Sequence, residues 1–175
     1  MPFIAIDFEA SCLPQLGRSF PVEVGVADAS GWSRSWLIRP HESWSAWEWR
    51  AEAEALHGIS RSRLEREGLD VTVVAAQLRS AVEGSTLLAD SYFDDGWCRA
   101  LFDAAGEGAH PPVRCLAELQ AFHDVDPTAL NRALVRADGL RIHRHRAEDD
   151  ARWSARVMSE IGVERDRVFS QARAA

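Results

Sequence analysis

The chain has 175 residues, 46% of them hydrophobic, and a formal net charge of −7. This length and composition predict one globular domain over residues 1–175, and the negative charge argues against a protein that coats nucleic acid through a basic surface. The sequence contains no apolar run long enough to cross a bilayer and opens without a basic leader, so we expect no membrane span and a cytoplasmic location.

Short apolar segments separated by turn residues begin the chain and predict a meander of three strands. The predicted strands are residues 3–8, 21–27 and 32–38, with a hairpin turn over residues 28–31. The first strand is apolar on both faces, which is typical of a strand inside a mixed or parallel sheet.

Helices and two further strands are predicted after this meander. Residues 45–56, 61–67 and 72–82 have helical patterns, and Ser60 is the expected N-cap of the second helix. Strands at residues 86–89 and 113–115 then alternate with helices at residues 93–105, 116–122, 128–137 and 147–161. This order predicts an α/β protein, whereas the pattern leaves the order of the strands in the sheet open.

Asp7 and Glu9 do not fit a buried strand. They are two residues apart, so both side chains lie on the same face of the sheet. Two carboxylates on one face of a central strand are unfavourable unless they are paired or bound to a metal ion. On their own they fit an exposed strand end equally well, because such pairs are common in a chain with 27 acidic residues.

A second acidic position lies on the last predicted helix. Asp150 precedes Trp153 by three residues on an apolar stripe that continues to Val157 and Ile161. An acid on this stripe needs a partner, and His145 lies five residues before it, just ahead of the helix. His143 and Glu148 have the same spacing, so a shifted register is an alternative. The inward stripe favours His145 and Asp150.

Three more acids follow the predicted strand at residues 86–89, where α/β sheets place their sites. Helical spacing allows either Asp94 or Asp95 to face inward, and Asp90 can cap the helix. Three separate segments thus offer carboxylates at the ends of core elements. Such oxygen ligands suit two Mg²⁺ or Mn²⁺ ions, which stabilise the attacking and leaving oxygens of a phosphodiester. A neutral histidine nearby can accept a proton from the attacking water.

These residues resemble the motifs of the DEDDh exonucleases of the RNase H-like superfamily, a group that includes RNase T, oligoribonuclease and the proofreading exonucleases of bacterial replicases. The three motifs are matched by residues 6–11 (IDFEAS), 92–94 (YFD) and 145–151 (HRAEDDA). Residues 21–25 (PVEVG) and 56–60 (LHGIS) are similar to two further family segments. The similarity follows the family order over nearly the whole chain.

The resemblance implies an RNase H-like fold, with a mixed five-stranded sheet flanked by helices. It also implies hydrolysis of single-stranded RNA or DNA from the 3′ end to nucleoside monophosphates, with two Mg²⁺ or Mn²⁺ ions. Asp7, Glu9 and Asp150 would bind one ion closely, with Asp7 bridging to the second. The resemblance selects Asp94 over its neighbours, acting largely through water, and makes His145 the general base.

Further contacts to the terminal nucleotide are expected from residues beside the motifs: Ala10, Leu13, His57 and Phe93. Asp90 occupies a position where the family often has asparagine, and its charge either disfavours close approach of phosphate or has another role. Three tryptophans, at positions 44, 47 and 49, could stack on bases, although core packing is the favoured interpretation.

Two other hypotheses compete with the exonuclease. The first is a catalytically weak or inactive module that binds nucleic acid or protein, and the second is a generic α/β domain with surface acids. Seven arginines from Arg132 to Arg156 outnumber four acids there, which fits a solvated helical face and a phosphate contact equally well. The sequence does not separate RNA from DNA, and it is compatible with a monomer or a homodimer.

Overall fold

A five-stranded mixed sheet forms the centre of the computed structural model, which describes residues 2–118, 125–139 and 145–162. The strands are β1 (Phe3–Ala10), β2 (Pro21–Ala27), β3 (Ser33–Leu37), β4 (Thr86–Ala89) and β5 (Val113–Cys115). Their order is β3-β2-β1-β4-β5. β1 pairs antiparallel with β2 and parallel with β4, so the sheet changes from antiparallel to parallel at β1. The mixed five-stranded sheet expected from the sequence is confirmed.

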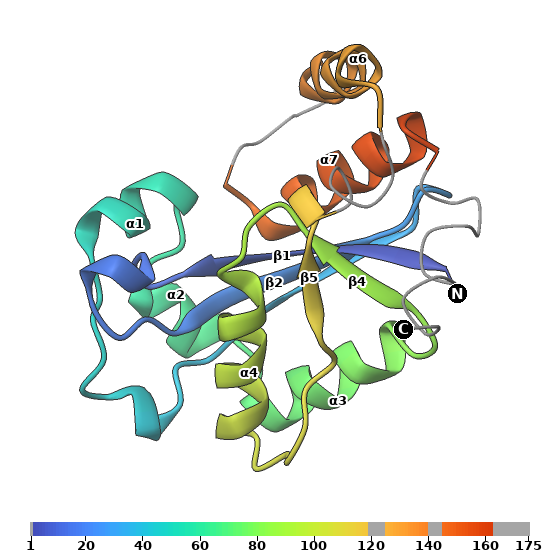
Figure 1. Ribbon diagram of the computed structural model, residues 1–175. Coiled ribbons are helices and arrows are strands. Elements are labelled where there is room, and N and C mark those ends of the chain that lie inside the picture. Colours follow the sequence, from blue (N-terminus) through green and yellow to red (C-terminus); the bar gives the residue numbers. More distant parts are fainter. Residues whose placement is uncertain (1, 119–124, 140–144, 163–175) are drawn as a thin grey trace.

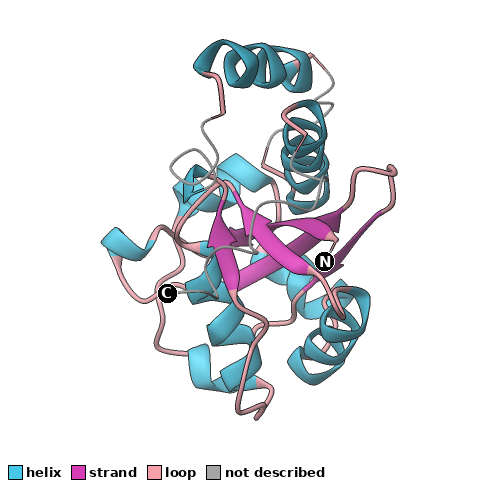
Figure 2. Ribbon diagram, turned by 45° about the vertical axis from the view of Figure 1, so that its right-hand side comes forward, coloured by secondary structure: helices cyan, strands magenta, loops and turns pink. Residues whose placement is uncertain are grey.

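Helices cover both faces of this sheet (Figure 1). On one face α7 (Ala147–Glu160) packs over β1 and β2, and α6 (Pro127–Asp138) lies on the outer side of α7. On the opposite face lie α3 (Val71–Ala81) and α4 (Asp94–Ala104). α1 (Ala51–His57) and α2 (Arg61–Glu67) belong to the connection between β3 and α3. Figure 2 shows the sheet enclosed between the helices.

The alternating side chains of β1 separate two hydrophobic clusters. Ile4, Ile6 and Phe8 belong to the large core that includes α3 and α4 residues. Ala5 instead packs with Ala151 of α7. Because side chains two apart along a strand share a face, Asp7 and Glu9 lie on the same side as Ala5. Both carboxylates therefore face the layer that contains α7.

The helix predicted at residues 45–56 is wrong in its first half. A 3-10 helix, η2, covers Glu42–Trp44, and α1 begins only at Ala51. Between them the backbone bonds to a distant loop, because the N–H of Glu48 donates to the carbonyl of Arg18 and the N–H of Arg50 to that of Ser11. These tertiary bonds replace the helical bonds that the local composition favoured.

The apolar stripe on the last helix has a different neighbour from the one expected. Trp153 and Val157 pack with α6, and Ala151 and Met158 contact the sheet, while Ile161 packs against both clusters. Asp150 is nevertheless buried, because it lies at the end of α7 that faces β1. The inference that Asp150 faces inward is correct, although the stripe that suggested it covers another surface.

The remaining predicted elements match the structure to within about two residues at each end. Beyond Glu118, the helix predicted at residues 116–122 lies outside the described residues, as does the alternative residue His143. A second 3-10 helix, η1, covers Pro14–Leu16. None of the described helices is both long and apolar enough to cross a bilayer.

Candidate active site

A cavity of about 510 Å³ opens at the C-terminal end of β1. All the candidate site residues from the sequence line it, namely Asp7, Glu9, Ala10, Leu13, His57, Phe93, Asp94, His145 and Asp150. They come from β1, the loop that follows it, α1, the β4–α4 connection, the first turn of α4, and α7 with the residues just before it. The three acidic segments and the histidine are thus brought to one place.

The cavity exists because β1 extends beyond its parallel neighbour. β4 pairs with β1 only as far as Ala5, so the edge of β1 on that side is free of strand pairing from Asp7 onward. Asp94, at the first position of α4, occupies this gap, and its Oδ1 accepts a hydrogen bond of 2.9 Å from the N–H of Phe8. Its Oδ2 is buried and has no hydrogen-bond partner among the described residues. One oxygen thus fixes Asp94 to β1, and the other remains for a ligand.

Asp95 has a different environment, which separates it from Asp94. Its carboxylate accepts a hydrogen bond from the N–H of Val113 and contacts the side chains of His110 and Arg99. These contacts connect α4 to β5 outside the cavity. Asp94 is therefore the residue of this pair that lines the cavity.

The start of α7 holds Asp150 and His145 together. The Oδ2 atom of Asp150 accepts a hydrogen bond of 2.8 Å from the N–H of His145, whose φ is 60°. A ring nitrogen of His145 and carboxylate oxygens of Glu9 and Asp150 lie within 4.8 Å of one another. A non-glycine residue with this backbone conformation is uncommon, and such strain is characteristic of functional sites.

The carboxylates repel one another in a poorly solvated space. Burial, then the charges of Asp94 and Glu9, raise the pKa of Asp7 well above its usual value. Burial, followed by the charge of Asp150, raises the pKa of Glu9 to about 8. Burial and the charge of Asp90 raise the pKa of Asp94 to about 8. The ionised forms are unfavourable in this setting, and a divalent metal ion would supply compensating positive charge. The donor set therefore fits hard divalent ions.

Glu23 and Arg146 are positioning residues that the sequence reasoning did not identify. Glu23 is the neighbour of Glu9 on β2, and the guanidinium of Arg146 donates hydrogen bonds of 3.0 and 2.7 Å to its carboxylate. The N–H of Ala147 donates a third. The signal was present, because Glu23 is an acid within an otherwise apolar strand and needs a cation.

Close contact between backbones completes the attachment of α7. A Cβ added to Gly25 of β2 would lie 2.2 Å from the carbonyl carbon of Ala147. Glycine is required there because any side chain would push the helix away from the sheet. Glu148 extends the attachment to β3 by accepting hydrogen bonds from Ser33 and Ser35.

The cavity wall combines apolar side chains with a neutral histidine. Leu13, Leu16 and Leu56 line it and are each more than half exposed. The Nδ1 atom of His57 accepts the N–H of Ile59 at 3.0 Å, and burial lowers the pKa of this histidine. The neutral ring therefore has its hydrogen on Nε2.

The tryptophans and arginines outside the cavity have structural contacts. Trp44 is buried and stacks on Phe20 at 5.4 Å, and Trp44, Trp47 and Trp49 are absent from the cavity lining, as the core-packing interpretation predicted. Several arginines of α6 and α7 pair with acids, as in Arg136 and Arg156 with Glu160. These pairs account for part of the local positive excess.

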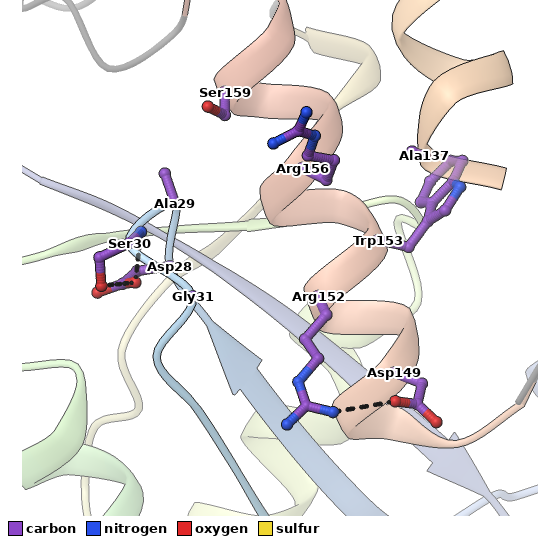
Figure 3. Close-up of a pocket in the computed structure, with 10 residues that line it drawn as sticks. All are labelled: Asp28, Ala29, Ser30, Gly31, Ala137, Asp149, Arg152, Trp153, Arg156 and Ser159. Atoms are coloured by element: carbon purple, nitrogen blue, oxygen red, sulfur yellow. Dashed lines mark hydrogen bonds and ion pairs between the residues drawn. The ribbon is translucent and has the colours of Figure 1, made fainter. Parts of the chain in front are cut away.

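A second cavity, of about 380 Å³, lies between the β2–β3 turn and the outer side of α7 (Figure 3). Arg152 and Arg156 line it, and Figure 3 shows Arg152 paired with Asp149. None of the candidate site residues contributes to this cavity. Its arginines are neutralised by acids on the same helix, including Glu148 and Glu160.

Comparison with known proteins identifies the fold. No family model matches the chain, and no curated protein matches its sequence. A structure of exonuclease I is similar to it with a TM-score of 0.68 and 19% identity, over 95% of this chain and 42% of that chain. The zinc-bound complex of E. coli exonuclease I with single-stranded DNA has a TM-score of 0.67 and 19% identity, over 95% and 41%. The complex of the E. coli enzyme with a dA16 oligonucleotide has a TM-score of 0.66 and 19% identity, over 95% and 42%.

These likenesses show that the chain has the RNase H-like fold of exonuclease I, which confirms the fold expected from the sequence. The chain spans about two-fifths of the length of the exonuclease I chains that it matches.

Proposed function

We propose that this chain is a metal-dependent 3′–5′ exonuclease that releases nucleoside monophosphates from single-stranded nucleic acid. The observation that carries the proposal is the meeting of Asp7, Glu9, Asp94, Asp150 and His145 in one cavity at the end of β1. Four carboxylates with one histidine match the chemical requirements of phosphodiester hydrolysis better than those of a structural cluster.

The carboxylates are the proposed ligands of two Mg²⁺ or Mn²⁺ ions. When bound, these ions supply positive charge to the attacking and leaving oxygens of the phosphodiester. Asp7 and Glu9 are fixed by the strand pairing of β1 with β2. The hydrogen bond from Phe8 to Asp94 fixes the third carboxylate, and the hydrogen bond from His145 to Asp150 fixes the fourth. The protein thus holds the oxygens in place before any ligand arrives, which reduces reorganisation during reaction.

His145 is the proposed general base. It is only partly buried, which leaves its ring accessible from the cavity, and its backbone is held by Asp150. A neutral ring nitrogen there accepts a proton from the attacking water. The same ring can return a proton to the leaving 3′ oxygen, so one residue serves both transfers.

The cavity wall is proposed to hold the terminal nucleotide. Leu13 and Phe93 offer apolar surface to a base or sugar, and the backbone of Ala10 lies beside the motif carboxylates. The Nε2–H of His57 is a neutral donor on the same wall, close to the backbone of Ala10. A donor of this kind can bind a phosphate or sugar oxygen without adding charge.

Single-stranded DNA is the first substrate to test. Structures of exonuclease I with the same fold contain single-stranded oligonucleotides, including dA16 and dT13. RNA of the same sequence should be compared in the same assay, because a contact to the 2′-hydroxyl would make the enzyme distinguish the two polymers.

The test is a time course on a 5′-labelled oligonucleotide with Mg²⁺ or Mn²⁺. A ladder that shortens from the 3′ end, with nucleoside monophosphates as products, is expected. Asp94→Asn should abolish the ladder, while the matched variant Asp95→Asn should retain it, because Asp95 binds Val113 and His110 outside the cavity. Absence of the ladder in the parent chain, or equal activity in Asp7→Ala, contradicts the proposal.

A binding module without catalysis is the competing proposal. Asp90 favours it, because this carboxylate lines the cavity and its charge raises the pKa of both Asp7 and Asp94, which opposes an approaching phosphate. Binding of an oligonucleotide without cleavage, at any divalent ion concentration, would support this alternative. Conversion of Asp90 to Asn should then increase affinity for the oligonucleotide.

A further inference from the structure

His145 lies among the carboxylates closely enough to act as a metal ligand. One of its ring nitrogens and oxygens of Glu9 and Asp150 lie within 4.8 Å of one another. Zinc ligands of these types lie about 2.0–2.2 Å from the ion, so modest side-chain rotations would bring all three donors to one ion. Glu9 and Asp150 are 9% and 7% exposed, which gives the trio two fixed members and one more accessible member.

The cavity therefore contains two overlapping donor sets. The first consists only of oxygens, from Asp7, Glu9, Asp94 and Asp150, and it suits Mg²⁺, which prefers oxygen and retains water. The second consists of Glu9, Asp150 and the imidazole of His145, and a mixed nitrogen and oxygen set suits Zn²⁺. The sets share Glu9 and Asp150. Asp7 and Asp94 belong only to the first set, and His145 belongs only to the second.

A separate observation supports binding of a cation in this cavity. The Oδ2 atom of Asp94 is buried, in a residue that is 1% exposed, and it has no hydrogen-bond partner among the described residues. A buried carboxylate oxygen is rarely left without a partner unless water or an ion completes its environment. Asp94 belongs only to the oxygen set, so a variant at this residue tests that set separately from the Zn²⁺ set.

We propose that Glu9, His145 and Asp150 form a Zn²⁺ site and that Zn²⁺ bound there inhibits the chain. The inhibitory part rests on the proposed function, whereas the binding part does not. A ring nitrogen that binds Zn²⁺ has no free electron pair, so His145 cannot accept the proton of the attacking water. Zn²⁺ also binds a given nitrogen and oxygen site more tightly than Mn²⁺, so inhibition should occur at lower concentrations than activation.

Direct measurement of binding tests the site. Zn²⁺ affinity is measured by competition with a chromophoric chelator, Mn²⁺ affinity by calorimetry, and the visible spectrum of bound Co²⁺ reports nitrogen ligation. His145→Ala should weaken Zn²⁺ binding by at least about tenfold, change the Co²⁺ spectrum and leave Mn²⁺ affinity nearly unchanged. Asp94→Asn should weaken Mn²⁺ binding and leave Zn²⁺ affinity and the Co²⁺ spectrum nearly unchanged. Retained Mn²⁺ binding in His145→Ala also shows that this variant is folded.

A histidine outside the cavity provides the matched control. His110 contacts Asp95 on the far side of α4, so His110→Ala should leave Zn²⁺ affinity at the parent value. The proposal is overturned if His145→Ala keeps the parent affinity for Zn²⁺, or if it loses Zn²⁺ and Mn²⁺ equally while remaining folded.

The nuclease assay separates failure of this proposal from failure of the proposed function. Zn²⁺ binding that depends on His145, in a chain that does not cleave oligonucleotides, supports the site and contradicts the exonuclease. Cleavage with Mg²⁺ that low Zn²⁺ does not inhibit supports the exonuclease and contradicts the inhibition. If Zn²⁺ inhibits cleavage by the parent chain but binds His145→Ala as tightly as the parent, the assigned ligands are wrong.

Discussion

Arg146 and Glu23 form a bidentate ion pair that joins the start of α7 to the middle of β2. The Nε and Nη2 atoms of Arg146 lie 3.0 and 2.7 Å from the two carboxylate oxygens of Glu23. Arg146 follows His145 directly, and Glu23 is the strand partner of Glu9. The pair therefore connects the two sides of the candidate site without entering the cavity lining. It neutralises an acid that would otherwise add to the repulsion around Glu9.

Removal of one member of this pair should destabilise the fold. Arg146→Met leaves the buried carboxylate of Glu23 without a cation, and we expect a loss of about 3 kcal/mol in the free energy of unfolding, measured with urea. The double variant Glu23→Gln with Arg146→Met should recover most of this loss, because no charge remains buried. Equal stability of the single and double variants would show that the ion pair does not hold α7.

Gly25 should be intolerant of a side chain. In Gly25→Ala the new Cβ would lie 2.2 Å from the Ala147 carbonyl carbon, so α7 has to move away from β2. Because α7 positions Asp150, we expect lower thermal stability and weaker Mn²⁺ binding by calorimetry. Gly96→Ala is the control, since a Cβ there meets no atom within 4 Å. Its Mn²⁺ affinity should match the parent chain, and its thermal stability should be equal or higher, because alanine favours the helix α4. Parent-like Mn²⁺ affinity in Gly25→Ala would contradict the positioning role of this contact.

The pH dependence of stability should reveal the buried carboxyls. Glu9 and Asp94 have ordinary pKa values of 4.5 and 3.8, and both are raised to about 8 in the fold. Their stabilising contribution is complete below the ordinary values and is lost as the pH rises toward and through 8. In EDTA the melting temperature should therefore fall between pH 5 and pH 9, and Mg²⁺ should restore it most strongly at the alkaline end.

Neutral variants control for the general effect of charge on stability. Glu9→Gln should reduce the decline between pH 5 and pH 9, because it has no proton to lose. If the decline in EDTA is as steep in Glu9→Gln and Asp94→Asn as in the parent chain, these carboxyls are not its cause.

Leu13 and Trp44 should affect different properties. Trp44 is 2% exposed and stacks on Phe20, so Trp44→Ala should lower stability by about 3–5 kcal/mol in urea denaturation. Leu13 is 54% exposed at the cavity, so Leu13→Ala should leave stability nearly unchanged and raise KM for an oligonucleotide severalfold. A parent-like KM in Leu13→Ala would remove this residue from the proposed substrate wall.

Residues close in the sequence carried most of the successful predictions. The strands, the second and third helices, and the shared face of Asp7 and Glu9 follow from periodicity and turn residues, which are local properties. The resemblance to DEDDh exonucleases then selected Asp94 over Asp95. In the structure Asp94 lines the cavity, where its Oδ1 accepts a hydrogen bond from the N–H of Phe8.

Contacts between distant segments decided the features that the sequence patterns predicted wrongly. The backbone of Glu48 bonds to Arg18 instead of forming a helical turn, and the stripe containing Val157 packs on α6 instead of the sheet. No local pattern records either choice, because each depends on which surface the folded chain brings nearby.

The sequence by itself determined which side chains are available for chemistry and which of them share a strand face or a helix end. Only the tertiary structure decided that β4 stops pairing at Ala5, that Asp94 fills the gap, and that Glu23 holds Arg146. Side-chain identity is a local property, whereas the spacing of charges in a cavity depends on where separate elements pack. Those packed positions place the ring of His145 beside Glu9 and Asp150.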